Sequence, residues 1–312
     1  MKLIKVLSVW TMSLGSSFIA CNQSIPVESQ AFQVDRCNEY LQNQLIFQEL
    51  ADKAVENARV GEKTFDELNL EFGAVRLAIQ EMQSKPIQQG ETEHFGSIRT
   101  GGLVTPMTHK SGPYQRGFER IVAQMELVDE AAEGAGSYGL RALPGVPGVD
   151  TKYYAFLKPD PTDSRNMLVL TRFERISPTH VQMVHTTPEY LGKVMDIVRA
   201  KYKIALDSNK PATEIMRAIG EFHWWFAQAT PFLRGSASIG EMHAASLLKY
   251  HKIKGLTLYN YLGFFKRHRI HLDVWALTTS DPLEFAQNYE LALRFKHGIP
   301  VKFPSIAVSG EK

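Results

Sequence analysis

The spacing of the apolar residues changes twice along the chain, and these changes constrain the fold more than any other feature of the sequence. Residues 36–59 and 64–84 repeat apolar side chains at helical intervals, which predicts two amphipathic helices. Between 153 and 184, three runs are instead rich in β-branched and aromatic residues, which are typical of strands. Helical spacing returns after Pro188. The sequence therefore predicts a helical region, a short β segment and a second helical region.

The β segment is expected to be small. The runs 167–171 and 180–184 lie close enough along the chain to form a hairpin, although their connection is longer than a two-residue turn. We therefore predict a mainly α fold of the α+β type, with a helical core and a small β-hairpin. The further elements that the pattern predicts are a short strand near 103–104 and helices at 114–133, 189–206, 211–229, from 239 onward and at 283–296.

Glycine and proline punctuate the chain most strongly between 139 and 148. A chain of 312 residues has room for one large domain or two modest ones. We therefore predict a boundary at this stretch, with a linker and helical region over 22–148, the main domain over 149–277 and a tail over 278–312.

The first residues resemble a bacterial export signal. Two lysines precede an uncharged apolar stretch over 6–20, which has the length of a signal h-region and is shorter than a membrane span. A small residue, Ala20, then stands directly before Cys21, as in lipoprotein signals. We predict a signal peptide over 1–21, lipidation at Cys21, membrane attachment through that lipid, and a location in the periplasm or outer membrane. Plain cleavage near Ala20, followed by secretion, is the alternative.

Composition and charge exclude some partners. The net charge is +2, and no stripe of lysine and arginine marks a nucleic-acid surface, so no nucleic-acid partner is predicted. Neither the histidines nor the two cysteines form a set of three or four ligands at metal-binding spacing. We therefore predict no metal site.

The functional interpretation rests on the loop 230–238, which reads Thr-Pro-Phe-Leu-Arg-Gly-Ser-Ala-Ser and runs into a predicted helix. Small residues before a helix let backbone N–H groups converge on an anion, which the helix dipole also favours. Arg234 adds a charge-assisted hydrogen bond in this interpretation. The structural alternative is a capping box, in which Ser238 and Glu241 satisfy those N–H groups internally.

The same segment resembles the signature of Fic-type domains, the Fic/Doc superfamily. In that signature a helix leads into His-Pro-Phe-x-x-Gly-Asn-Gly-Arg, and a second helix follows. Here Pro231, Phe232 and Gly235 stand at matching positions, and Gly240 matches a glycine common just past the motif. The resemblance covers roughly residues 150–255. It implies a Fic-like helical core whose hairpin acts as a flap, with a protein target docking on 167–184.

The departures from the signature imply altered chemistry. Thr230 stands in place of the histidine that acts as general base, and Arg234 in place of the acidic residue that holds Mg²⁺. Ser236 and Ser238 replace the asparagine and the arginine. Ordinary AMP transfer is therefore not expected. The catalytic candidates are Thr230 and Arg234, with His223 as a reserve base.

The expected ligand is a nucleotide or sugar-nucleotide held without a metal, and whether a phosphate-bearing group is also transferred stays open at this point. The alternative function is that of a non-catalytic envelope lipoprotein with a binding or structural role. The expected ligand-binding residues are Arg234, Gly235, Ser236, Ala237, Ser238 and Glu241.

Overall fold

The computed structural model describes residues 30–83, 95–109, 114–130, 140–143, 153–253 and 270–293. Its helices are α2 (Gln30–Asn57), α3 (Phe65–Met82), α4 (Gln115–Glu130), α5 (Pro188–Ala205), α6 (Ala212–Ala229), α7 (Ser236–Tyr250), α9 (Leu272–Leu277) and α10 (Pro282–Leu293). Its strands are β1 (Val104–Thr108), β2 (Leu140–Leu143), β3 (Tyr153–Asp160), β4 (Asp163–Ser177) and β5 (His180–Val184). The predicted helices are thus confirmed to within a few residues at their ends, and α9 was not predicted.

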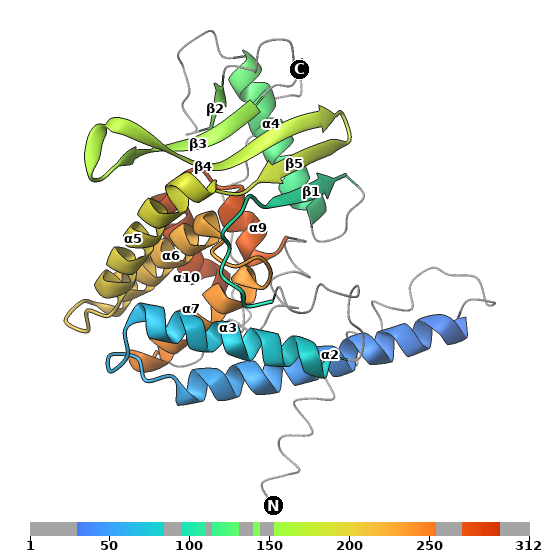
Figure 1. Cartoon of the computed structure of the whole chain (residues 1–312), viewed down its shortest axis with the longest axis vertical. Helices are drawn as coiled ribbons and strands as arrows, with labels where there is room; N and C mark the ends of the chain where they lie inside the picture. Colours follow the sequence, from blue (N-terminus) through green and yellow to red (C-terminus); the bar gives the residue numbers. More distant parts are fainter. Residues whose placement is uncertain are drawn as a thin grey trace, which may run out of the picture.

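The strands form a five-stranded antiparallel sheet in the order β1-β5-β4-β3-β2 (Figure 1). The predicted mainly α fold with a small hairpin is therefore wrong, and the fold is a mixed α+β fold. We predicted β4 to be much shorter than it is, because its second half alternates buried residues such as Phe173 with half-buried charged ones such as Arg172 and Glu174. A half-buried strand has this alternation and lacks the continuous apolar run that we sought.

The predicted hairpin between the second and third β runs exists, but its register differs. The residues of β4 that pair with β5 are 172–177, joined by a tight turn in which Ser177 pairs with His180. The run 167–171 lies further from that turn, where Val169 pairs with Leu157 of β3. The long strand β4 therefore pairs with both β3 and β5.

Helices cover the sheet and build the core around α6. Helix α4 packs against β1 and β2, while α5 and α6 pack against β4, and Figure 1 shows the sheet between α4 and the group of helices below it. Helix α6 also contacts α5, α7, α9 and α10. Its last two turns are buried all round, so polar side chains there need internal partners. Gln228, for example, accepts a bond from the backbone of Thr171 and donates one to Ala276 O.

The α2–α3 hairpin packs against α7 at the opposite end from the sheet (Figure 1). Helix α3 begins at a capping box between Thr64 and Glu67. Its residue Gly73 lies so close to the backbone of Gly96 that neither position has room for a Cβ. This contact brings α3 against the segment that supports the loop 230–238.

Some predictions concern residues outside the described part of the chain. The signal segment 1–21 and the lipidation at Cys21 lie there, as do residues 294–312 of the predicted tail. Within the described ranges, no helix combines the length and the apolar character that a bilayer span requires. The domain division at 148–149 stays a prediction.

Candidate ligand-binding pocket

The loop between α6 and α7 is held in a left-handed conformation at both ends. Thr230 ends α6 with φ 44° and ψ 62°, and its hydroxyl donates a hydrogen bond to Ala227 O at 2.7 Å. Gly235 begins α7 with φ 88°, a conformation that glycine adopts without steric cost. A Cβ at Gly235 would also lie 2.6 Å from Cγ of Arg76 on α3. Both the positive φ and the contact with Arg76 therefore favour glycine at position 235.

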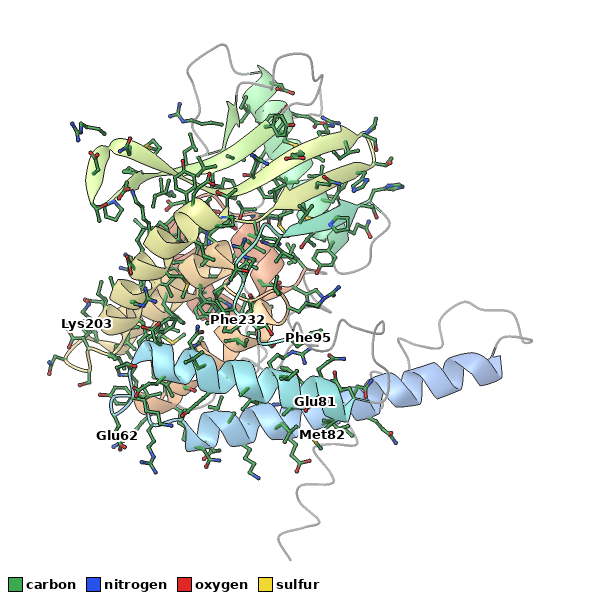
Figure 2. The ribbon with its side chains drawn as sticks, viewed as in Figure 1. Glu62, Glu81, Met82, Phe95, Lys203 and Phe232 are labelled. Carbon is green, nitrogen blue, oxygen red and sulfur yellow. The ribbon has the colours of Figure 1, made fainter. Side chains whose placement is uncertain are left out.

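A short backbone ladder with the segment 95–99 fixes the loop. Gly96 N–H donates to Arg234 O at 3.1 Å, Leu233 N–H to Ser97 O at 3.0 Å, and Arg99 N–H to Pro231 O at 2.8 Å. Phe232 is fully buried beside Phe95 at the junction with α3 (Figure 2). The loop is therefore part of the packed structure and already has a defined shape without a ligand.

The buried guanidinium of Arg99 holds the carboxyl end of α6. It donates hydrogen bonds to four backbone carbonyl oxygens, those of Gly101, Thr186, Ala229 and Thr230, at 2.7–3.0 Å. The last two carbonyls lie at the end of α6, where the helix dipole favours a positive charge. Arg99 therefore joins the α6 terminus to the connection that follows β5.

The predicted capping box at α7 is wrong. The helix starts at Ser236, three residues earlier than the box requires, and no side chain caps it. The Ser238 hydroxyl donates instead to Gly235 O at 2.9 Å, and the Glu241 side chain is buried inside the fold with 1% exposure. The backbone N–H groups of residues 236–238 donate to no other described residue, and they stay available to a ligand.

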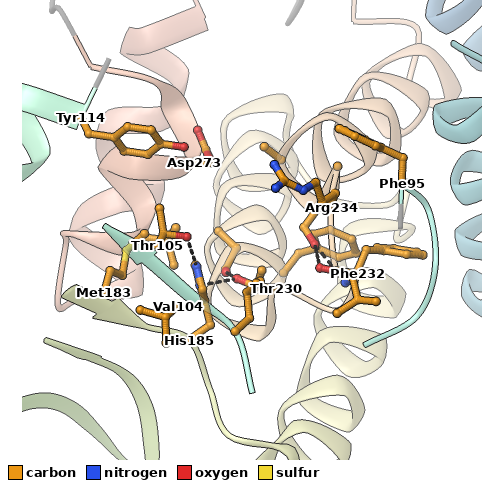
Figure 3. A pocket seen from close by; sticks show the side chains of 18 of the residues that line it. Phe95, Val104, Thr105, Tyr114, Met183, His185, Thr230, Phe232, Arg234 and Asp273 are labelled. Carbon is orange, nitrogen blue, oxygen red and sulfur yellow. Dashed lines mark hydrogen bonds between the residues drawn. The ribbon is translucent and has the colours of Figure 1, made fainter. Parts of the chain in front are cut away.

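A pocket of about 360 Å³ opens beside this helix terminus (Figure 3). Its wall on the loop side is formed by Arg234, Gly235, Ser236 and Ala237. The other residues that line it are Phe95, Leu103, Val104, Thr105, Pro106, Tyr114, Met183, His185, His223, Phe226, Ala227, Thr230, Phe232, Leu233, Asp273 and Leu277.

His185 forms the polar floor of the pocket. Its Nδ1 lies 3.0 Å from Thr230 Oγ1 and its Nε2 lies 2.9 Å from Thr105 Oγ1 (Figure 3). Because the only hydroxyl proton of Thr230 goes to Ala227 O, we assign the ring proton to Nδ1 of His185. Burial, with a smaller contribution from the positive Arg99, lowers the pKa of His185 to about 3. The floor is therefore neutral at physiological pH.

The two side walls carry different polar groups: a cation on one, and a buried carboxyl group and a phenol on the other. Figure 3 shows Arg234 and Phe95 on one side of the pocket, and Tyr114 and Asp273 on the other. Arg234 is exposed, with its guanidinium carbon 6.0 Å from the centre of the Phe95 ring. Oδ1 of Asp273 is buried without a hydrogen-bond partner among the described residues, and burial raises the pKa of this carboxyl although His271 opposes the shift. Burial, with Asp273 adding, raises the pKa of Tyr114 to about 12.

The structure brings some of the expected site residues together. Six of them line the pocket: Thr230, Arg234, Gly235, Ser236, Ala237 and His223. Ser238 and Glu241 are not among the lining residues. Thr230 acts as a bridge, because its hydroxyl is bonded to both His185 and Ala227. The roles assigned to these residues, and the docking of a protein target on 167–184, stay predictions.

Sequence reasoning missed His185, Thr105, Tyr114 and Asp273. They come from the end of β5, from β1, from the residue before α4 and from α9, and only the folded sheet and helices bring them together. The polar run His-Thr-Thr at 185–187, directly after a strand of apolar residues, is a signal that could have drawn attention to one of them.

With this geometry established, comparison with known proteins gives two matches. The model of the AvrB_AvrC family, described as avirulence protein, matches residues 157–293. Avirulence protein B of Pseudomonas savastanoi pv. glycinea is 32% identical over 81 residues, which are 26% of this chain and 25% of that protein. The alignment thus spans about a quarter of the curated relative. The chain is similar to avirulence proteins over the region that contains β4, β5 and the helices around the pocket.

The comparisons correct the predicted family. The assignment to Fic-type domains is wrong, since the family model that matches is that of avirulence proteins. The residues shared with the Fic signature shape the turn: Phe232 fills the core and Gly235 supplies the left-handed residue. These residues match the Fic signature because both sequences form a turn between two helices. The match therefore gives no information on the reaction or the ligand. The signal-peptide and lipoprotein interpretations also find no support in these matches, and we do not retain them.

Three buried histidines predict that the protein loses stability in acid. Burial lowers the pKa of His185 to about 3, of His223 to about 4 and of His243 to about 3. In an unfolded chain the pKa is about 6.5, so the unfolded state binds more protons and stability falls as the pH drops below that value. Glu241 and Asp273 oppose this trend, because burial raises their pKa values and the folded state then holds the extra proton.

Urea unfolding at about pH 6, 5.5 and 5 measures the balance. We expect the free energy of unfolding to fall by about 1 kcal/mol between pH 6 and pH 5, because the histidines then take up about one proton more on unfolding than the two acids release. A His223→Gln variant should reduce the slope by about one proton, whereas the exposed His109→Gln should leave it unchanged. A free energy that stays constant from pH 6 to pH 5 would contradict the prediction.

Proposed function

We propose that the protein is an effector that acts inside a host cell, and that its pocket binds a nucleotide or sugar-nucleotide. The match to avirulence proteins over residues 157–293 supports the first part, because avirulence is a property of a pathogen towards its host. The predicted location in the periplasm or outer membrane has no observation in its favour. The chemistry of the pocket supports the second part.

The ligand proposal rests on one observation: the first residues of α7 form part of the pocket wall. The backbone N–H groups of Ser236 and Ala237 have no acceptor among the described residues, and both residues line the pocket together with Arg234. A helix amino terminus carries a partial positive charge, and arginine pairs with phosphate through two parallel hydrogen bonds. Together they favour a phosphate group at this wall over a neutral ligand.

The opposite wall fits the rest of such a ligand. Oδ1 of Asp273 and the hydroxyl of Tyr114 offer polar partners to ribose or sugar hydroxyls. Leu103, Val104 and Leu277 supply apolar surface for a ring. A ligand with phosphate at one end and hydroxyl groups at the other therefore matches both walls. We propose binding and not transfer, since the hydroxyl of Thr230 is fully bonded and provides no base.

Thermal unfolding with ATP, CTP, UDP-sugars, CDP-choline and dTDP-sugars tests the proposal. A ligand present at about 100 times its dissociation constant adds about 2.7 kcal/mol, which raises the Tm by roughly 4–6 °C for a chain of this size. Each ligand is measured with and without Mg²⁺. No shift with any of them would contradict the proposal and leave a non-catalytic binding protein as the alternative.

An Arg234→Gln variant locates the binding. Losing a charge-assisted contact to phosphate costs about 1.5–3 kcal/mol, so we expect the affinity to fall by roughly 10-fold to 150-fold. The matched control is Arg217→Gln, an exposed arginine on α6 that does not line the pocket. Equal affinities for the Arg234→Gln and Arg217→Gln variants would show that the phosphate does not lie at this wall.

A further inference from the structure

Glu241 is a carboxyl group enclosed in the core without a hydrogen-bond partner among the described residues. It lies on α7, in the second turn after the pocket, with 1% of its surface exposed. Neither Oε1 nor Oε2 lies within hydrogen-bond distance of a donor, and no ion pair includes this residue within the described ranges. None of the proposed functions of the pocket uses it.

The charged and titratable groups around Glu241 come from several helices. On α6, Nδ1 of His223 lies 2.9 Å from the hydroxyl of Tyr289 on α10. Asp273 on α9 acts on Glu241 as a like charge, and Glu241 acts in the same sense on Tyr289. Among the described residues, Arg234 and Arg76 of α3 lie at the start of α7 beside Gly235, and Lys249 near its other end pairs with Glu56 of α2.

An ionised carboxylate has no source of stabilisation in these surroundings. Its transfer from water into an apolar interior costs far more than a protein of this size can compensate, so such a group takes up a proton instead. We infer that Glu241 is a neutral carboxylic acid in the folded protein at physiological pH. Because the protonated side chain carries no charge, it can stay buried, and the first turns of α7 stay packed against the core. Burial and the neighbouring Asp273 raise the pKa of Glu241, in agreement with this state.

The protonation state of Glu241 affects the pocket through the packing of α7 on α6. At Gly240 a Cβ would lie 2.8 Å from Cδ1 of Phe226 and 3.7 Å from Nε2 of His223, so the two helices touch at this turn. An ionised Glu241 must reach water, and the helices leave it no route unless α7 moves. The same helix carries Ser236 and Ala237 into the pocket wall. Raising the pH should therefore loosen this wall.

Infrared spectroscopy and thermal unfolding of the full chain test the inference without any ligand. A protonated carboxyl group has its own carbonyl band, separate from that of a carboxylate. We compare the parent with Glu241→Gln, which keeps the shape and cannot ionise, and with Glu81→Gln as the matched control on the exposed end of α3 (Figure 2). Asp273→Asn identifies any second band from the other buried acid.

We expect the parent to show a carboxylic-acid band at about pH 7 that Glu241→Gln lacks and Glu81→Gln keeps. We also expect the Tm of the parent to fall by several degrees between about pH 7 and pH 9, and that of Glu241→Gln to fall less. If Glu241→Gln does not fold, loss of the parent's band at the same pH as its loss of Tm supports the inference. Absence of the band from the parent, or its persistence in Glu241→Gln, would overturn it.

Discussion

Replacing Arg99 by methionine is expected to lower the free energy of unfolding by about 3–5 kcal/mol, because each buried carbonyl left without a donor costs about 1–3 kcal/mol and water recovers only part of that cost. The side chain is 2% exposed and donates to four backbone carbonyl oxygens. Methionine fills much of the volume but donates nothing. The loss should therefore reflect the hydrogen bonds and the charge, and not a cavity.

Urea unfolding of three variants measures this effect. Arg99→Lys keeps the positive charge with fewer donors, so we expect a loss between that of Arg99→Met and that of the parent. Arg217→Met is the matched control, because Arg217 is exposed on α6 and has no hydrogen bond to the described residues. If Arg99→Met and Arg217→Met unfold at the same urea concentration, Arg99 does not hold the end of α6.

Replacing Gly96 by alanine is expected to cost about 3 kcal/mol and to weaken ligand binding at the same time. Gly96 has φ 73°, which is unfavourable for any residue with a Cβ, and that Cβ would overlap the carbonyl oxygen of Gly73 on α3. Since Gly96 N–H donates to Arg234 O, a displaced Gly96 moves the loop that lines the pocket.

The chain offers close controls for this prediction. A Cβ at Gly101 or Gly102 would meet nothing within 4 Å, and neither glycine has a positive φ. Gly101→Ala and Gly102→Ala should therefore unfold within about 0.5 kcal/mol of the parent. A Gly96→Ala variant as stable as these two would show that α3 can move away freely, and that the close contact does not constrain the loop.

The part of the site that is local in sequence could be predicted from the sequence. Small residues before a helix create free N–H groups whatever the rest of the fold, and the residues Arg234 to Ala237 do line the pocket. His185, Tyr114 and Asp273 could not be predicted in the same way. They meet only because β5, α4 and α9 pack around α6, and no pattern within a single segment shows that packing.

The error at Glu241 has a local cause. The sequence predicts that α7 begins after Ser238, and with that start Glu241 faces the helix terminus as a capping residue. In the structure Gly235 takes the left-handed conformation and the helix begins three residues earlier. That shift turns Glu241 into the core. A single glycine torsion angle thus changes an expected surface carboxylate into a buried acid.

The sheet was underestimated for a related reason. The β2 strand, Leu140–Leu143, lies in a stretch rich in glycine and proline, which predicted a loop. Edge strand β1 contains Pro106, whose missing N–H is tolerated only at a sheet edge or bulge. The partner of β1, strand β5, is distant in sequence, so pairing and not propensity makes β1 a strand.

A crystal structure of the full chain with the nucleotide or sugar-nucleotide that raises the Tm most is the most direct test of the account. If the phosphate binds at the start of α7, one of its oxygens lies within about 2.7–3.2 Å of the N–H groups of Ser236 and Ala237, and of the guanidinium of Arg234. Hydroxyl groups of the ligand should face Asp273 and Tyr114. A ligand bound in this pocket with its phosphate turned away from α7, or bound elsewhere on the molecule, would contradict the account.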